Sequence, residues 1–215
     1  LPISDHASLA LCLSAYLDGL DPTLRPHQAA FGVASPVTGD QIQLTNRDWS
    51  FSIEGLKSAF GLARLDVIND FSAIGHAVGA LRDQDWEALP GPDWPDHLTG
   101  VVSIVGPGTG LGVGARILNA DGQEVIIASE GGHASFAPID GIEIEILKVM
   151  LGKFPRVSNE RILSGPGLGH LYEALSQVRG RAVMSPGAPA ILEAAIKGSD
   201  SLAVEADRKS TRLNS

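Results

Sequence analysis

Five glycines and one threonine occur within nine residues, from Gly106 to Gly114, directly after a β-branched apolar run at 101–105. Such a run is typical of a buried strand. A backbone without Cβ atoms can turn its N–H groups toward an anion and let phosphate oxygens approach closely. The segment is therefore a candidate phosphate-binding loop. A glycine-rich hairpin that is shaped only by packing is an equally weighted alternative.

Two familiar phosphate-binding loops fit this segment poorly. A P-loop ends in Gly-Lys-Ser/Thr, and no lysine lies in or near the glycine segment. A dinucleotide-binding fingerprint is nearly met by Gly110, Gly112 and Ala115, but it must open a helix. Residues 111–118 instead predict a strand, followed by an Asp-Gly turn and a second strand at 123–128. If residues 111–118 form a strand rather than a helix, the glycines are not a dinucleotide-binding fingerprint, and a nicotinamide-dependent enzyme is excluded.

A carboxylate follows another predicted strand. Asn69 and Asp70 end the apolar segment 65–69 and begin a helical segment at 71–81. In open α/β sheets, ligands bind at the carboxyl ends of strands, where a catalytic carboxylate is expected. Asp and Asn are also preferred helix N-caps, so a purely structural role for Asp70 carries equal weight. If one oxygen caps the helix, the other can still act on a substrate.

Four further polar residues could face a ligand. Glu130 and His133 flank a pair of glycines, which let the backbone turn so that both side chains could line one cavity. One Glu and one His are too few for a metal site. On this local evidence, purely structural roles for Glu130 and His133 are slightly favoured. Glu160 opens a short helix, where an acid ordinarily complements the helix dipole. Asn46 lies in a predicted turn and indicates little by itself.

The elements that must position these residues alternate between strand and helix, which predicts an α/β fold. Residues 83–98 contain three prolines and are predicted to form an irregular segment at the surface. The expected strands are 28–34, 41–44, 65–69, 101–105, 111–118 and 123–128, and the expected helices are 4–17, 52–60, 71–81, 142–152, 159–163, 167–178 and 192–197.

Composition narrows the class of protein. The 215 residues are 44% hydrophobic with a formal net charge of −9, which argues against a nucleic-acid-binding groove. A single cysteine, Cys12, allows no intrachain disulfide and suits a cytoplasmic setting. No apolar run has the length of a membrane span. Residues 207–215 lack hydrophobic periodicity and resemble a translated sequencing adapter, so we expect no function there.

Together, these motifs resemble the bacterial ATP-dependent glucokinase family, a branch of the hexokinase and actin-like ATPase superfamily. The resemblance covers about residues 31–172. The matching segments, in order, are Ser35–Gly39 (SPVTG), Leu44–Ser50 (LTNRDWS), Val67–Phe71 (VINDF), Gly106–Gly112 (GPGTGLG), Ser129–His133 (SEGGH), Phe136–Pro138 (FAP) and Ser158–Leu168 (SNERILSGPGL).

The resemblance implies a role for each candidate residue. Asp70 would be the general base toward the primary hydroxyl of glucose, and ATP, carried with Mg²⁺, would donate the phosphoryl group. A hexose presents hydroxyls that both donate and accept, which carboxylates, an amide and an imidazole suit. The implied sugar-binding residues are Asn46, Asn69, Asp70, Glu130, His133 and Glu160, and the implied nucleotide-binding residues are Gly106, Gly108, Thr109 and Gly110.

The resemblance also implies an actin-like (ribonuclease H-like) fold with two lobes around a sugar cleft. We expect a partial small lobe at 1–100 and a partial large lobe at 101–206, because the family's Asp-x-Gly-Gly-Thr phosphate loop and its adenosine-side glycine motif are not found. The chain alone is therefore expected to be inactive, and the family allows a homodimer. Another hexose kinase, or a sugar-binding regulator without transfer activity, remains an alternative.

Overall fold

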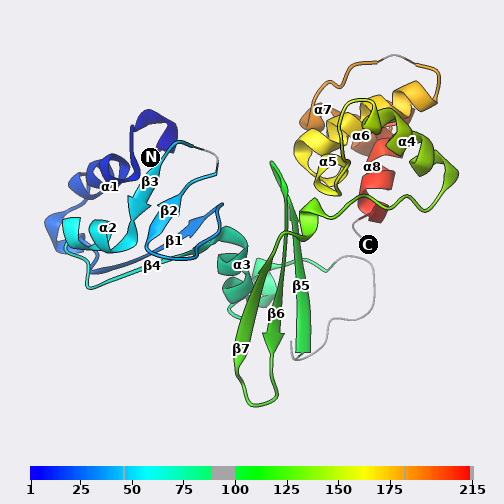
Figure 1. Cartoon of the computed structure of the whole chain (residues 1–215). Helices are drawn as coiled ribbons and strands as arrows, with labels where there is room; N and C mark the ends of the chain where they lie inside the picture. Colours follow the sequence, from blue (N-terminus) through cyan, green and yellow to red (C-terminus); the bar gives the residue numbers. More distant parts are fainter. Residues whose placement is uncertain (46, 89–99, 182, 214–215) are drawn as a thin grey trace. The chain divides into compact units, whose positions relative to one another are not determined.

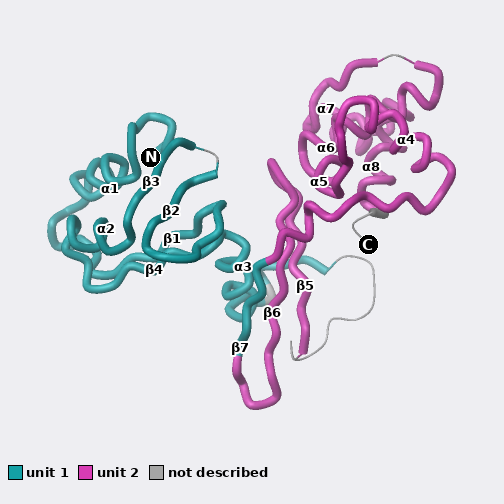
Figure 2. The backbone as a smooth tube through the Cα atoms, viewed as in Figure 1, with its two compact units in different colours: residues 1–98, 124–128 teal, residues 99–123, 129–215 magenta. Residues whose placement is uncertain are grey.

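A computed structural model describes residues 1–45, 47–88, 100–181 and 183–213. The chain divides into two compact units (Figure 2). The first unit contains residues 1–98 and 124–128, and the second contains residues 99–123 and 129–215.

Among its described residues, the first unit contains two strand pairs, three α-helices and residues 124–128 of strand β7 (Glu124–Ser129). Strand β1 (Gln28–Val33) runs parallel to β4 (Arg64–Asn69), and β2 (Gln41–Gln43) is antiparallel to β3 (Ser50–Ser52). The helices are α1 (Leu9–Asp18), α2 (Ile53–Ala59) and α3 (Asp70–Val78), with short 3₁₀ helices at Ile3–Asp5, Pro22–Leu24 and Asp83–Asp85. The core of this unit is formed by Ile42, Leu56, Leu65 and Val67.

The strand-to-helix passage that carries Asp70 follows from this pairing. In the parallel ladder of β1 and β4, Val33 lies opposite Asn69 at the carboxyl end of both strands. Side chains of β1 alternate between exposed and half-buried, as expected for a strand with one covered face. The chain enters α3 directly from β4, so Asp70 lies at the strand end where ligands gather in α/β proteins.

The glycine segment forms a β-hairpin in the second unit. Strand β5 (Gly100–Pro107) pairs antiparallel with β6 (Leu111–Leu118), and β7 (Glu124–Ser129) follows in the sheet order β5-β6-β7. The prediction of strand, turn and strand after Gly110 is confirmed. The connection expected between the two strands, residues 106–110, is shorter in the structure, because the ladder continues to the Pro107–Leu111 pair and leaves only residues 108–110 as the turn.

Helix α6 is the centre of the second unit, and α4, α5, α7 and α8 pack against it or against one another (Figure 1). The core of this unit includes Ile146, Ile162, Leu171, Leu175 and Ile191. The helices are α4 (Gly141–Leu151), α5 (Glu160–Leu163), α6 (Gly165–Val178), α7 (Ala188–Lys197) and α8 (Ser201–Leu213), and a 3₁₀ turn, η4, covers Gly131–His133.

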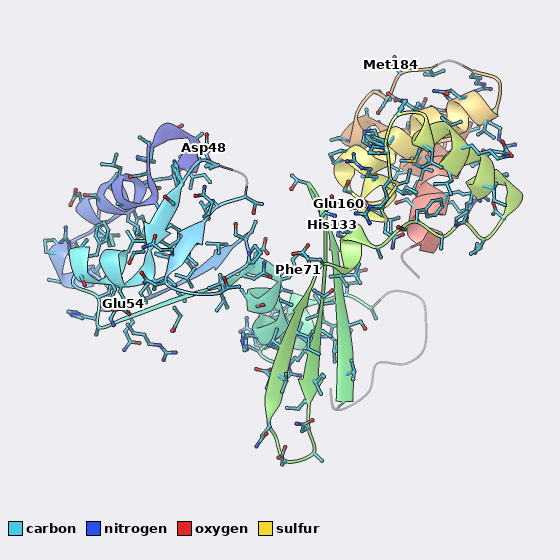
Figure 3. All side chains as sticks on the ribbon, viewed as in Figure 1. Asp48, Glu54, Phe71, His133, Glu160 and Met184 are labelled. Atoms are coloured by element: carbon cyan, nitrogen blue, oxygen red, sulfur yellow. The ribbon has the colours of Figure 1, made fainter. Side chains whose placement is uncertain are left out.

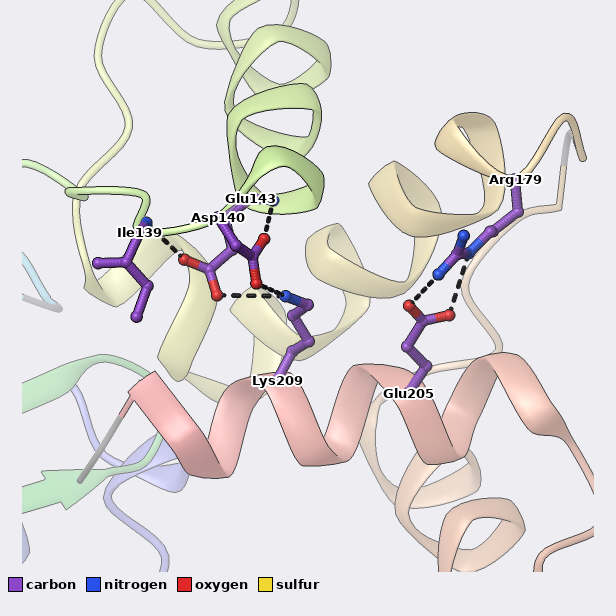
Figure 4. Close-up of polar contacts among 6 residues, drawn as sticks. All are labelled: Ile139, Asp140, Glu143, Arg179, Glu205 and Lys209. Carbon is purple, nitrogen blue, oxygen red and sulfur yellow. Dashed lines mark hydrogen bonds and ion pairs between the residues drawn. The ribbon is translucent and has the colours of Figure 1, made fainter.

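Residues 207–213 continue α8, a helix that the sequence pattern did not predict. Lys209 Nζ lies 2.6 Å from Asp140 Oδ2 and 3.2 Å from Glu143 Oε1, at the start of α4 (Figure 4). Arg179, just after α6, makes two hydrogen bonds to Glu205 of α8. These contacts tie α8 to the rest of the helical unit.

Candidate functional site

Asn69 is the residue that caps α3, so the alternative role of Asp70 as the helix cap is corrected. Asn69 has extended backbone angles, and its Oδ1 accepts hydrogen bonds from the amides of Phe71 at 3.0 Å and Ser72 at 3.2 Å. Asp70 occupies the first helical position. Its Oδ1 accepts from Asn69 Nδ2 at 3.0 Å and from Phe71 N at 2.9 Å.

The carboxylate of Asp70 is therefore held by one oxygen only. Within the part of the chain that the structure describes, Oδ2 of Asp70 accepts no hydrogen bond. Asn69 orients the carboxylate through its amide while its own carbonyl caps the helix. The arrangement gives a fixed carboxylate with one oxygen open to a ligand.

Asn46 lies outside the described residues, but the preceding turn is well anchored. The backbone N–H of Thr45 donates to the hydroxyl of Ser35 at 2.9 Å, and Ser35 is buried. The hydroxyl of Thr45 also donates to the carbonyl of Ala34. These bonds fix the chain just before position 46 to the end of β1.

The structure brings Glu130, His133 and Glu160 together in the second unit. His133 Nε2 is 3.6 Å from Glu130 Oε2, and His133 Nδ1 is 3.8 Å from Glu160 Oε1. Figure 3 shows Glu160 of α5 next to His133 of η4. Both distances exceed those of a hydrogen bond, so the imidazole faces two carboxylates with its donors and acceptors still available. Such a cluster can bind hydroxyl groups.

The backbone around this cluster is fixed by contacts that the sequence did not predict. Arg156 Nη1 donates to the carbonyl of His133 at 2.7 Å, and the amide of Leu111 donates to Glu160 Oε2 at 3.0 Å. A Cβ atom added to Gly132 would lie 2.0 Å from the carbonyl oxygen of Leu111. Gly132 is thus required because η4 packs directly on the backbone of β6.

The turn at 108–110 is the part of the glycine segment that is open to an anion. Gly108 N donates to Gly110 O at 2.8 Å, and Gly108 O accepts from Gly165 N, also at 2.8 Å. Among the described residues, the amides of Thr109 and Gly110 have no backbone acceptor. Gly106 differs from the other three nucleotide-binding candidates, because it lies in β5 opposite Gly112.

A cavity of about 410 Å³ lies between the beginnings of α6 and α7. His170 Nδ1 is buried at this cavity without a hydrogen-bond partner among the described residues. Glu173 also lines it, and the hydrogen bond from Lys153, followed by that from the Ser185 amide, lowers the pKa of Glu173. The lining residues are Gly165, Pro166, Gly169, His170, Glu173, Ser185, Gly187 and Ala188.

Sequence reasoning assigned no role to His170, since it has no partner at a suggestive spacing. The structure connects its cavity with the glycine turn, because Gly165 both lines the cavity and donates to Gly108.

No group of three His, Cys, Asp or Glu residues that could hold a metal occurs within residues 1–45, 47–88, 100–181 and 183–213. None of the helices described there is long and apolar enough to cross a bilayer.

The fold is the mixed α/β fold of solved glucokinase structures. The glucokinase from an Antarctic psychrotroph superposes with a TM-score of 0.83 and 30% identity, covering 99% of this chain and 65% of that one. The glucokinase from Balamuthia mandrillaris, solved in complex with glucose, has a TM-score of 0.68 and 20% identity, covering 94% of this chain and 63% of that one. The second similarity concerns the fold alone.

The glucokinase family model matches residues 1–207, and the chain belongs to this family. The glucokinase of Nitrobacter hamburgensis is 41% identical over 207 residues, which are 96% of this chain and 63% of that protein. That of Zymomonas mobilis is 40% identical over 200 residues, or 93% of this chain and 61% of that protein. The chain thus spans somewhat over 60% of the length of these relatives.

Proposed function

We propose that this chain supplies the sugar-binding residues and the phosphate-contacting turn of an ATP-dependent glucokinase that phosphorylates the 6-hydroxyl of glucose. The observation that carries the proposal is the cluster of Glu130, His133 and Glu160 beside the glycine turn, with Glu160 joined to that turn through Leu111. Family membership supports the reaction type.

In this proposal Asp70 accepts or orients the proton of the primary hydroxyl through its open Oδ2. Phosphoryl transfer needs alignment and charge stabilisation more than covalent chemistry, and a carboxylate fixed by Asn69 meets the first need. Glu130, His133 and Glu160 bind the remaining hydroxyls as acceptors and donors. We assign the same role to Asn46 by its position in the motif.

We place the nucleotide phosphates at the turn of residues 108–110, where the amides of Thr109 and Gly110 are available. Gly106 is carried over as a nucleotide-binding residue from the family motif, and it lies beside this turn in β5, opposite Gly112. The cavity at His170 adjoins this turn through Gly165, and we propose it as the place for the nucleoside part of ATP. Mg²⁺ would arrive on the ATP phosphates and neutralise their charge, and we assign it no ligand from the described residues. A cytoplasmic location and a homodimer belong to the same proposal.

The test is the variant Asp70→Asn in the protein expressed from its complete gene. Turnover should fall by roughly 10²–10⁴-fold, as for loss of a general base, while glucose Kd changes by less than about tenfold. Calorimetry measures the Kd and a coupled assay measures ADP release. Turnover that survives the substitution would remove Asp70 from the mechanism.

The same protein also tests the two alternative functions, another hexose kinase and a sugar-binding regulator. A panel of glucose, fructose, mannose and N-acetylglucosamine distinguishes a glucokinase from another hexose kinase. A non-catalytic sugar-binding regulator would bind a sugar yet release no ADP. The retained Asp70, with one open oxygen, favours a kinase, because a protein that only binds sugar has less need of a base there.

A further inference from the structure

The two oxygens of the Glu160 carboxylate face different residues of the second unit. Oε2 accepts the backbone N–H of Leu111 at 3.0 Å, and Oε1 faces His133 Nδ1 at 3.8 Å. A hydrogen bond to an ionised carboxylate is stronger than one between neutral groups. Leu111 therefore fixes the rotamer of Glu160 and determines where Oε1 lies.

Gly110 provides the space that this contact needs. A Cβ atom added at Gly110 would lie 2.6 Å from Glu160 Oε2 and 3.4 Å from its Cδ. At Gly108, in the same turn, an added Cβ would meet nothing within 4 Å. The backbone angle of Gly110 is not in the left-handed region, so the demand for glycine comes from Glu160 rather than from the turn.

We infer that Gly110 and the Leu111 amide are positioning elements of the sugar pocket, and that they act through Glu160. This inference rests on the proposed role of Glu160 as a sugar-binding residue. The glycine segment then serves both substrates: its turn faces the phosphates, and its last glycine leaves room for the carboxylate that binds the sugar. A substitution in a nominal nucleotide loop should therefore weaken sugar binding.

The decisive variant is Gly110→Ala, with Gly141→Ala as a matched control. Gly141 lies in the same unit, at the first position of α4, and an added Cβ there meets nothing within 4 Å. We expect Gly110→Ala to raise the glucose Kd about tenfold or more, as for loss of a hydrogen bond to a charged group. Gly141→Ala should leave the Kd unchanged. Calorimetry on the protein expressed from its complete gene measures both.

A double-mutant cycle with Glu160→Ala separates positioning from general damage to the turn. If Gly110 acts through the carboxylate, Gly110→Ala causes no further loss of sugar affinity once the carboxylate is gone. The amide resonance of Leu111 should move in Glu160→Ala and stay in place in Gly141→Ala. An additive loss in the cycle, or an unchanged Kd in Gly110→Ala, overturns the inference.

The same measurements keep the inference distinct from the proposed function. If the wild-type chain binds none of the four sugars of the panel, the proposed function fails, and the positioning role fails with it. If the wild type binds a sugar and Gly110→Ala binds it equally well, only the positioning role fails. Thermal unfolding of each variant shows that the comparison is made between folded proteins.

Discussion

Gly132 packs so closely on β6 that there is no room for a side chain, and this close packing fixes the position of the neighbouring His133. We predict that Gly132→Ala lowers the free energy of unfolding by about 2 kcal/mol or more, since its Cβ would collide with backbone rather than with a flexible side chain. Urea denaturation measures the loss. Gly141→Ala is the control and should be neutral or stabilising by up to about 1 kcal/mol. Equal effects at both glycines would contradict the packing argument.

The residues that carry chemistry could be named from the sequence, but their geometry could not. Asn69 and Asp70 are both good capping residues, and only the extended backbone at Asn69 decides which of them caps α3. The role of Leu111 escaped prediction for another reason. A backbone amide leaves no sequence signal, and its partner Glu160 is 49 residues away.

At the scale of elements, prediction succeeded where local chemistry sets the structure. The β-branched run and the Asp-Gly turn predicted the strands around the glycines, and Gly122 has the positive φ of 81° that such a turn requires. Helix α8 was missed because tertiary contacts stabilise it. Its buried residues Leu202, Ala203 and Ala206 form a short apolar stripe, and the polar residues that follow continue the same helix.

A hydrogen bond that predicts a pH dependence joins helix α6 to Asp200, the residue directly before α8. Tyr172 Oη donates to Asp200 Oδ2 at 2.7 Å. This bond, ahead of other causes, lowers the pKa of Asp200 and raises the pKa of Tyr172. A depressed carboxyl pKa contributes stability above the unfolded value of 3.8, and a raised phenol pKa contributes stability below 10.0.

We therefore predict that Tyr172→Phe lowers the free energy of unfolding by about 1–3 kcal/mol near neutral pH. The difference from wild type should shrink as pH falls through the lowered pKa of Asp200. It should shrink again as pH rises through the raised pKa of Tyr172. Urea denaturation at a series of pH values measures this. A difference that stays constant from acid to alkali would mean that the phenol contributes only by packing.

The ion pairs of Lys209 predict how strongly α8 is held. Its partner Glu143 has a side chain that is only 1% exposed. Breaking a buried ion pair is costly, so Lys209→Met should lower the free energy of unfolding by about 3 kcal/mol. Lys197→Met is the control, because both partners of its pair with Glu193 are more than 60% exposed, and it should cost less than about 1 kcal/mol.

The double variant Lys209→Met/Glu143→Gln tests the cause of that loss. A neutral amide at position 143 can still accept the hydrogen bond from Ile139 N, which lies 2.8 Å from Glu143 Oε2 in the structure. Stability should therefore recover in part relative to Lys209→Met. If the double variant is as unstable as the single one, the loss comes from helix packing rather than from a buried charge.

At the scale of the whole molecule, each compact unit has its own hydrophobic core. Ile42 belongs to the core of the first unit and Leu175 to that of the second, and both side chains are almost fully buried. Cores formed from separate sets of residues allow each unit to open with its own free energy. The candidate residues are divided likewise, with Asp70 in the first unit and Glu160 in the second.

We predict that Ile42→Ala and Leu175→Ala each destabilise only their own unit, by about 2–5 kcal/mol. Hydrogen exchange read by mass spectrometry should become faster in peptides from β1 to β4 for the first variant, and in peptides from α4 to α7 for the second. Leu192→Ala, at a residue that is 40% exposed, is the control and should leave both patterns unchanged. If either core variant speeds exchange throughout the chain, the two units unfold as one cooperative body, and the division by cores has no thermodynamic meaning.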